Sequence, residues 1–388
     1  MNHITLHDMK DGLDRNQFQL NYQPKISLHT GDVIGAEALI RWNCGNDVIM
    51  PKDFIPFAEK TGFVSILTER VFELLGRDAP FLLAKRPDFK IAVNVSPHDF
   101  HKNRIVTYLE TLERVNSIAP TSLHLEITEE TATLASDELI TVMNALREYG
   151  ILFSLDDFGT GYSSLDILSR LPFSEIKLDQ SLVRQVGHNP KAKSIVSGTI
   201  QMANRLNLHT VGEGIETENL FEDMAFVGCD TVQGFWLSHP LGLSDFIDFV
   251  DSGQRWLPNV TGVLYRAQMD HIQWRHDLVD LYYRIKKGLF DVRHDLNRDL
   301  MPHISDHHAC KLGKWYTGVG SAYAMLDEYS TLDELHKKFH ETGAQLLQLA
   351  LRKDFEACYA TLRDFSSLSS EIIKCLNNLE ERISSKAV

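Results

Sequence analysis

The sequence predicts two regions of different class: a (β/α)8 barrel of the α/β class over residues 1–252, and an all-α, four-helix-bundle-like region over residues 263–388. In the first region, short runs of Val, Ile, Leu and Phe alternate with helical patterns, as in a (β/α)8 barrel. The second region has helical periodicity almost throughout and lacks strand-like runs. Residues 253–262 contain Gly, Pro, Asn and Thr, and are predicted to form a linker.

The strands of the barrel are predicted from apolar runs that Gly, Pro, Asn or Asp bound on either side. They cover residues 18–26, 33–42, 89–96, 123–128, 151–157, 175–179, 208–215 and 229–237. Helical patterns such as 54–75 and 192–207 lie between most of them. Only a short turn around 29–32 joins the first two strands, whereas a parallel connection needs a dozen or more residues. We therefore expect the first two strands to be antiparallel.

The composition and the net charge limit which binding partners and which cellular compartment we expect. The net charge of −14 disfavours loose binding to DNA or to an anionic membrane, but it is compatible with a phosphate-bearing substrate that binds together with cations. No apolar run approaches the roughly 20 residues that span a bilayer, and the first ten residues do not resemble a secretion signal. Five scattered cysteines argue against a disulfide framework. We expect a cytoplasmic protein.

Polar side chains stand near the carboxyl end of nearly every predicted strand, where barrel enzymes carry their catalytic residues. Buried strands seldom carry ionised groups unless these are paired or bind metal. One or two of the groups could form structural ion pairs, and a salt bridge is the alternative role of Lys177. The set comprises Glu37, Asn94, Glu126, Asp156, Asp157, Lys177, Asp179, Glu213 and Gln233.

The chemistry of this set points to metal-assisted phosphate hydrolysis. Carboxylates and an amide carbonyl are hard oxygen ligands that suit Mg²⁺ or Mn²⁺. The adjacent Asp156 and Asp157 allow one carboxylate to bridge two ions, which together can activate a water and stabilise charge on a phosphoryl oxygen. Lys177 would hold the attacking water. The pattern predicts a metal-dependent phosphodiesterase.

The motifs around these residues are more specific than the residues alone. Glu37-Ala38-Leu39 is followed by NVSP at 94–97, LEITEE at 125–130, LDDFGTGYSSL at 155–165, IKLD at 176–179, GEGIETE at 212–218 and QGFWLSHP at 233–240. In order and spacing, this series resembles the EAL-domain phosphodiesterases, which hydrolyse cyclic di-GMP to linear pGpG. The resemblance covers roughly residues 5–250.

The resemblance implies a role for each matching residue. One metal ion would be held by Glu37, Asn94, Glu126 and Asp156, and a second by Asp156, Asp157 and Glu213. Glu37, Asp157, Lys177 and Glu213 are the expected catalytic residues. Contacts with the substrate are expected from Gln23, Arg41, Asp179 and Gln233. Glu129 would brace the loop after Asp157, or be an ordinary acid at a helix N-terminus.

A second set of metal-ligand side chains lies in the helical region. His336 and His340 are spaced i, i+4 on one helix face, although such a pair is often merely solvated and a lone cysteine such as Cys310 is often a core residue. With His271 and the sequence Cys310–Trp315, they resemble the chemoreceptor zinc-binding (CZB) domain over 263–388. Three histidines and one thiolate would hold one Zn²⁺ in a closed tetrahedral site. Alternative donors, ranked lower, are His276, His303, His307 and His308.

The leading hypothesis is a cyclic di-GMP phosphodiesterase whose rate is controlled by zinc, or by oxidation of the zinc site, through the helical region. No acid of the motifs is missing, which favours an enzyme over the alternative of an inactive cyclic di-GMP receptor. A third interpretation is a helical region that only dimerises and carries vestigial histidines. Both families commonly dimerise, so we expect a homodimer.

Overall fold

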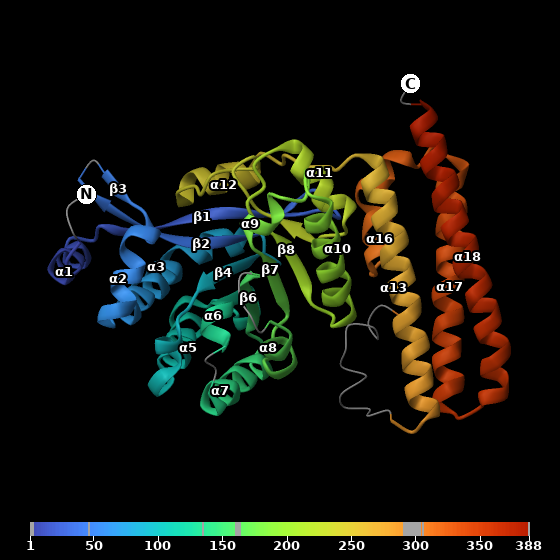
Figure 1. Ribbon diagram of the computed structural model, residues 1–388, viewed down its shortest axis with the longest axis horizontal. Helices are drawn as coiled ribbons and strands as arrows, with labels where there is room; N and C mark the ends of the chain where they lie inside the picture. Colours follow the sequence, from blue (N-terminus) through green and yellow to red (C-terminus); the bar gives the residue numbers. More distant parts are fainter. Residues whose placement is uncertain are drawn as a thin grey trace.

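The computed structural model describes residues 4–45, 47–133, 136–159, 164–289, 304 and 306–386. Its first part is a closed barrel with the strand order β1-β9-β8-β7-β6-β5-β4-β2, closed by the pairing of β1 with β2 (Figure 1). This confirms the predicted fold class. The barrel strands are β1 (Phe18–Ser27), β2 (Val33–Cys44), β4 (Lys90–Asn94), β5 (Leu123–Thr128), β6 (Leu152–Phe158), β7 (Glu175–Leu178), β8 (His209–Gly212) and β9 (Thr231–Val232).

Strand β1 runs antiparallel to both of its neighbours, β2 and β9, and the remaining barrel strands pair in parallel. The antiparallel first pair agrees with the prediction from the short turn, and its register places Gln23 opposite Glu37. A short strand that was not predicted, β3 (Asp47–Ile49), folds back onto the end of β2.

The last strand is shorter than predicted. The apolar run 229–237 predicts a long strand, but β9 contains only Thr231 and Val232. The chain turns just beyond it at residues 235–237. Gly234, before this turn, lies against the backbone of Ile215, where an added Cβ would come within 2.2 Å of the Ile215 nitrogen. The apolar residues that follow belong to this turn and do not continue the strand.

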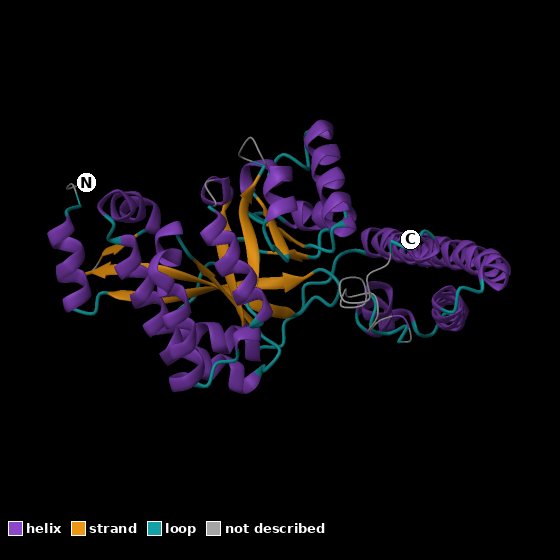
Figure 2. Ribbon diagram, turned by 90° about the horizontal axis from the view of Figure 1, so that it is seen from below, coloured by secondary structure: helices purple, strands orange, loops and turns teal. Residues whose placement is uncertain are grey.

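Helices cover the outside of the barrel (Figure 2). The predicted helical stretch 54–75 is split at Gly62, whose φ of +71° is readily adopted by glycine. The helices are α1 (Leu6–Asp14), α2 (Pro51–Thr61), α3 (Val64–Lys85), α4 (Pro97–Phe100), α5 (Arg104–Asn116), α6 (Glu129–Thr133), α7 (Asp137–Glu148), α8 (Ser164–Arg170), α9 (Gln180–Val183), α10 (Pro190–Arg205), α11 (Glu218–Phe226) and α12 (Leu243–Asp251).

Among its described residues, the C-terminal region is helical wherever it is regular, as predicted. Its helices are α13 (Val260–Lys286), α16 (Lys311–Thr317), α17 (Asp327–Leu351) and α18 (Phe355–Lys386). Helix α13 begins within the predicted linker 253–262, so the last three residues of that range are helical. The helices share a core of their own, in which the rings of Phe339 and Phe365 stack 4.2 Å apart. None of the helices in the described part of the chain has the length and apolar character to cross a membrane.

Helix α13 joins the two regions, because it packs against α10 and α11 of the barrel as well as against α16, α17 and α18. The C-terminal helices therefore lie at one side of the barrel (Figures 1 and 2).

Candidate active site and metal centres

The predicted polar side chains meet at the carboxyl ends of the barrel strands, around a cleft of about 680 Å³. Strands β2, β5, β6 and β7 carry, in this order, Glu37, Glu126, Asp156 and Lys177. Glu213 directly follows β8, and Gln233 directly follows β9. Those that line the cleft are Gln23, Glu37, Arg41, Asp156, Lys177, Glu213 and Gln233. Asn94 and Glu126 join them through neighbouring positions of β4 and β5, where they are paired in register.

Lys177 stands at the centre of the acids. Its ammonium nitrogen Nζ lies 2.8 Å from a carboxylate oxygen of Glu126 and 2.8 Å from one of Glu213. Asp156 and Glu37 follow at 3.1 Å and 3.3 Å. Burial alone would lower the pKa of Lys177, but these four carboxylates raise it well above its ordinary value. The lysine is therefore a permanent cation at the centre of the cluster.

Two amide side chains fix the orientation of the carboxylates. Asn94 donates a hydrogen bond of 2.8 Å from Nδ2 to Glu37 Oε1. Gln233 donates from Nε2 to Glu37 Oε2 and to Glu213 Oε1, both at 2.8 Å. The amide oxygen of Gln233 is buried and accepts no hydrogen bond from the described residues. It is thus available to a ligand or to a water in the cleft.

The carboxylates are crowded beyond what Lys177 compensates. Asp156, Asp157 and Glu213 each offer an oxygen within 4.8 Å of the others. Burial, reinforced by Asp156, raises the pKa of Asp157 to about 6. Burial raises the pKa of Glu213 to about 8, with Asp156 and Glu37 adding to the effect and Lys177 opposing it. Such a site takes up either protons or cations, so its oxygen donors fit divalent metal ions.

The backbone of Asp157 has a φ of +57°, in the left-handed region that residues other than glycine rarely adopt. This irregularity within β6 lets two consecutive carboxylates, those of Asp156 and Asp157, contribute to the same group of oxygens. Strained backbone of this kind is frequent at functional sites.

The predicted substrate residues fall into two groups. Gln23 and Arg41 line the cleft, and burial lowers the pKa of Arg41, whose Nη1 donates to the Ile40 carbonyl at 2.9 Å. Asp179 instead caps the N-terminus of α9, where its carboxylate accepts from the Ser181 backbone N–H at 2.9 Å. The structure thus brings Gln23 and Arg41 to the cleft. Asp179 caps a helix and also lies close enough to Asp157 to add to the rise in the pKa of that carboxyl that burial causes.

Glu129, at the start of α6, contacts the segment after β6. Its Oε2 accepts a hydrogen bond from the Gly159 backbone N–H at 3.2 Å, and its side chain is buried. This contact is compatible with a bracing role, although residues 160–163 of the same loop lie outside the described residues.

Several residues that line the cleft were missed in the sequence. Phe235 offered a usable signal in the sequence, because it is an aromatic residue within one of the motifs. In the structure it lines the cleft and is 54% exposed. Lys52 had no such signal, since its position depends on the hairpin of β2 with β3. The missed residues are Lys52, Gln180, Arg184, Glu216, Phe235 and His239.

A buried ion-pair network that was also missed continues from the acids into the barrel. Lys25 Nζ lies 2.9 Å from Glu126 Oε1 and 3.1 Å from Glu175 Oε1. Ser154 donates to the same Glu175 oxygen at 2.6 Å. Because Lys177 contacts the other oxygen of Glu126, each oxygen of this carboxylate faces one lysine.

We expect Glu175→Gln to lower the free energy of unfolding by about 3 kcal/mol at pH 7, since it removes one partner of a buried pair. Although burial raises the pKa of Glu175, Lys25 holds it well below its ordinary value of 4.5. A depressed folded-state pKa contributes stability that is present above pH 4.5 and is lost as the pH falls. Urea unfolding at pH 7 and at pH 3.5 should show the difference between variant and wild type shrinking at the lower pH. An equal difference at the two pH values would contradict the assignment of Glu175 as an ionised partner of Lys25.

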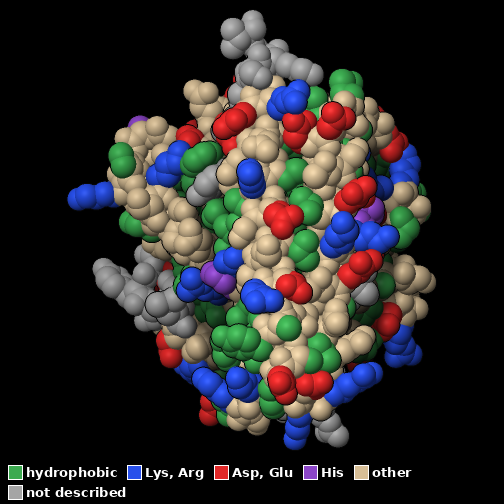
Figure 3. Space-filling model, turned by 90° about the vertical axis from the view of Figure 1, so that its right-hand side faces the viewer, with side chains coloured by type: hydrophobic (Ala, Val, Ile, Leu, Met, Phe, Trp, Pro, Cys, Tyr) green, Lys and Arg blue, Asp and Glu red, His purple; other side chains and the backbone are tan. Residues whose placement is uncertain are grey.

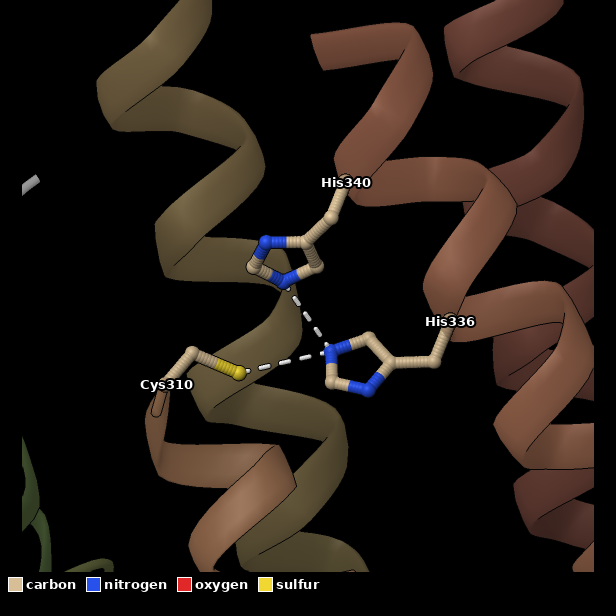
Figure 4. A group of neighbouring side chains, drawn as sticks. All are labelled: Cys310, His336 and His340. Carbon is tan, nitrogen blue, oxygen red and sulfur yellow. Dashed lines mark hydrogen bonds between the residues drawn. The ribbon is translucent and has the colours of Figure 1, made fainter. Parts of the chain in front are cut away.

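In the C-terminal region, Cys310, His336 and His340 form a compact buried group (Figure 4). His336 Nε2 lies 3.3 Å from Cys310 Sγ and 3.1 Å from His340 Nε2. Tetrahedral zinc with bonds of roughly 2.0–2.3 Å has ligand–ligand distances of roughly 3.3–3.7 Å, so these separations are close to those of a zinc site.

The protonation and orientation of these histidines also fit a metal. Burial, reinforced by His340, lowers the pKa of His336 well below its ordinary value, which keeps its imidazole neutral. The other ring nitrogen of His340, Nδ1, donates to the Ile304 carbonyl at 3.2 Å. A backbone partner of this kind is usual for metal-ligating histidines.

His271, the fourth predicted ligand, is nearby but outside this group. It is buried on α13, its Nε2 lies 3.1 Å from Ser369 Oγ, and burial lowers its pKa to about 3. Of the donors ranked lower, His276 is exposed and His303 lies outside the described residues. His307 and His308 form a separate group with Asp333.

The protein is a (β/α)8-barrel protein with a cleft of hard oxygen donors at the carboxyl end of the barrel. A helical region with a Cys-His cluster is joined to the barrel. Residues 7–240, more than half of the chain, match the EAL domain family, and the chain belongs to it. Residues 271–347 match the chemoreceptor zinc-binding domain.

Two similar proteins come from Pseudomonas aeruginosa. The bifunctional diguanylate cyclase/cyclic di-GMP phosphodiesterase MucR of Pseudomonas aeruginosa is 39% identical over 238 residues, which are 61% of this chain and 35% of MucR. The cyclic di-GMP phosphodiesterase RocR of the same organism is 31% identical over 62% of each chain. The chain thus spans about a third of the length of MucR and less than two thirds of RocR.

A solved structure of the PaMucR phosphodiesterase in complex with c-di-GMP superimposes with a TM-score of 0.59 at 38% identity, covering 62% of this chain and 98% of that one. The EAL enzyme Bd1971, with cAMP and cyclic di-GMP bound, has the same TM-score at 29% identity, covering 63% and 67%.

Proposed function

We propose that this chain hydrolyses cyclic di-GMP to linear pGpG in the barrel cleft, with two Mg²⁺ or Mn²⁺ ions. The observation that carries the proposal is the convergence of four carboxylates on Lys177, next to a crowded group of oxygens suited to divalent cations. The relatives that carry the name cyclic di-GMP phosphodiesterase support the substrate.

The proposal includes a set of ligands for each ion. Glu37, Asn94, Glu126 and Asp156 would hold one, and Asp156, Asp157 and Glu213 the other. When bound, the ions polarise a phosphoryl oxygen and make water more acidic.

The chain's own residues position the reactants. Lys177 offsets part of the repulsion among the carboxylates and can donate a hydrogen bond to the attacking water. Arg41, on the wall of the cleft, offers a planar set of donors to a phosphate of the substrate. The free amide oxygen of Gln233 can accept a hydrogen bond from water, while its Nε2 holds Glu37 and Glu213 in place.

The decisive assay incubates the purified protein with cyclic di-GMP and either Mg²⁺ or Mn²⁺, and separates the products by chromatography. We expect pGpG from the wild type and none from Glu37→Ala. Binding of the dinucleotide without product under every metal condition would make the protein a receptor rather than an enzyme.

Within the same proposal, the C-terminal region holds one Zn²⁺ and controls the rate. Cys310, His336 and His340 are three of the ligands, and His271 is the candidate for the fourth. A zinc-bound Cys310 thiolate would also react with strong oxidants, which offers a second way of changing the site.

The position of the cluster supports such control. A cavity of about 470 Å³ separates it from the barrel, lined on one side by Cys310, His336 and His340 and on the other by barrel residues such as Ser174, His209 and Asp230. These barrel residues stand at the amino ends of β7, β8 and β9, opposite the catalytic cleft.

A connection between the two ends of the barrel exists in the ion-pair network. A second hollow, of about 260 Å³, shares Ser174 and His209 with the cavity and reaches Lys25 and Glu175. Lys25 in turn contacts Glu126, a proposed metal ligand. The residues that line the two hollows, together with this ion pair, are therefore our proposed route from the zinc cluster to the catalytic acids.

We expect zinc removal to change the turnover rate by roughly 5- to 150-fold, the usual range of coupling between two sites. The measurement compares zinc-loaded and zinc-depleted protein, with excess Mg²⁺ and a zinc-selective chelator. His336→Ala should abolish the difference, while exposed His276→Ala should keep it. Equal rates, with the change in zinc content verified by elemental analysis, would leave the helical region without a regulatory role.

The chain is further proposed to act as a cytoplasmic homodimer without a DNA partner. On the side of the C-terminal helices, Lys and Arg are interspersed with Asp and Glu (Figure 3), so the described part of this face has no basic patch of the kind that binds nucleic acid. Exposed aromatic residues on the same helices, such as Tyr359 at 78% exposure, are available to a second copy. Light scattering after size-exclusion chromatography measures the oligomeric state.

A further inference from the structure

A second group of metal-ligand side chains lies beside the Cys310 cluster and has no role in the function proposed so far. His307, His308 and Asp333 each offer a ligand atom, and these atoms lie within 4.8 Å of one another. The same oxygen, Asp333 Oδ1, lies 3.2 Å from His307 Nε2 and 3.1 Å from His308 Nε2.

The separations are close to the edge length of roughly 3.3 Å in a tetrahedral site with bonds of about 2.0 Å to nitrogen and oxygen. Two imidazole nitrogens and one carboxylate oxygen are ligands that suit Zn²⁺ and related transition metals more than Mg²⁺. Three protein ligands leave a position for water, as in exchangeable metal sites.

The surroundings hold this group in place before any ion arrives. The ring of Tyr316 is stacked on that of His308, with centroids 5.9 Å apart and an interplanar angle of 10°. Tyr329 stacks on Tyr316 at 3.9 Å. Asp333 is fixed by its position on α17, three residues before His336.

The group differs from the first cluster in exposure. Its side chains are 16% (His307), 43% (His308) and 34% (Asp333) exposed, whereas the Cys310 cluster is buried. The two are close, since the ring centroids of His307 and His336 are 5.7 Å apart. An ion at the second group would thus feel the charge of the first ion, while Asp333 partly compensates it.

We propose that His307, His308 and Asp333 form a second Zn²⁺ site, weaker and more readily exchanged than the Cys310 site. It gives the helical region two zinc-binding steps instead of one. The inference goes beyond the proposed function and does not require it, because the second site has its own ligands.

The test is a zinc titration of the full chain, stripped of zinc and saturated with Mg²⁺ so that the barrel acids are occupied. We expect two binding steps in calorimetry. Asp333→Asn should weaken the second step by at least about tenfold, the size of effect that even indirect partners of a metal have. The matched control is Glu334→Gln, which removes one charge from the exposed neighbouring position of α17 and should keep both steps.

A second measurement separates this inference from the zinc site proposed above. Cobalt bound to a thiolate has a near-ultraviolet charge-transfer band, and cobalt bound to histidine and carboxylate does not. The Cys310→Ser variant should lose this charge-transfer band but should still bind one equivalent of cobalt. A wild type that takes up only one equivalent, or an Asp333→Asn variant that retains both steps, would overturn the second site. Should Asp333→Asn fail to fold by circular dichroism, His308→Ala replaces it with the same expectation.

Discussion

Glu37→Gln is expected to reduce the turnover of cyclic di-GMP about a thousandfold. Glu37 accepts hydrogen bonds from both amide side chains of the site and faces Lys177 at 3.3 Å. Glutamine keeps the size but removes the charge of a proposed metal ligand. Loss of the transition-state stabilisation that an ion supplies, about 4 kcal/mol, corresponds to about three orders of magnitude in rate.

The measurement is kcat with saturating substrate over a series of Mg²⁺ or Mn²⁺ concentrations. Glu218→Gln, an exposed acid at the start of α11, is the matched control and should retain full activity. A Glu37→Gln variant that keeps more than a tenth of the wild-type kcat at every metal concentration would exclude this residue as a metal ligand.

Lys177→Met is expected to have the second large effect, on stability as well as on activity. The variant leaves the carboxylates of Glu37, Glu126, Asp156 and Glu213 facing one another without their shared cation. Removing one partner of a buried ion pair costs about 3–5 kcal/mol. Divalent ions would offset part of the repulsion, so the loss of stability should be larger in EDTA than in excess Mg²⁺.

Thermal unfolding in the two buffers measures this difference. Lys193→Met is a suitable control, because Lys193 pairs with Asp223 at 2.8 Å in a more exposed position where an ion pair contributes little. A Lys177→Met variant as stable as wild type in EDTA would show that the lysine does not compensate the acids. Rate constants measured with Mg²⁺ should fall even where stability is restored.

The fold and the cleft were largely predictable, because both depend on order along the chain. Alternating strands and helices define a barrel, and the barrel then places Glu37, Asp156 and Glu213 at one end of it. The extent of β9 was not predictable, since the segment after it packs Gly234 against Ile215, which is distant in the sequence.

The buried network could not be found for a similar reason. Lys25 and Glu175 are far apart in sequence, and neither stands where a barrel enzyme carries its chemistry. Only the closed sheet brings them together, at 3.1 Å. In the helical region the sequence predicted His271, His336 and His340 as zinc ligands, but it could not show that the helix packing sets His271 against Ser369 and His336 against Cys310.

The reversed direction of β1 has a consequence for how the interior is filled. Along this strand, successive inward positions descend from the catalytic mouth toward the opposite end, contrary to the order in the parallel strands. Gln23 therefore stands at the cleft, whereas Lys25, two residues later on the same face, reaches the deeper carboxylates. A one-residue slip would turn both side chains outward. A single strand thus supplies one side chain to the substrate cleft and, one inward position deeper, the lysine that neutralises the buried carboxylates.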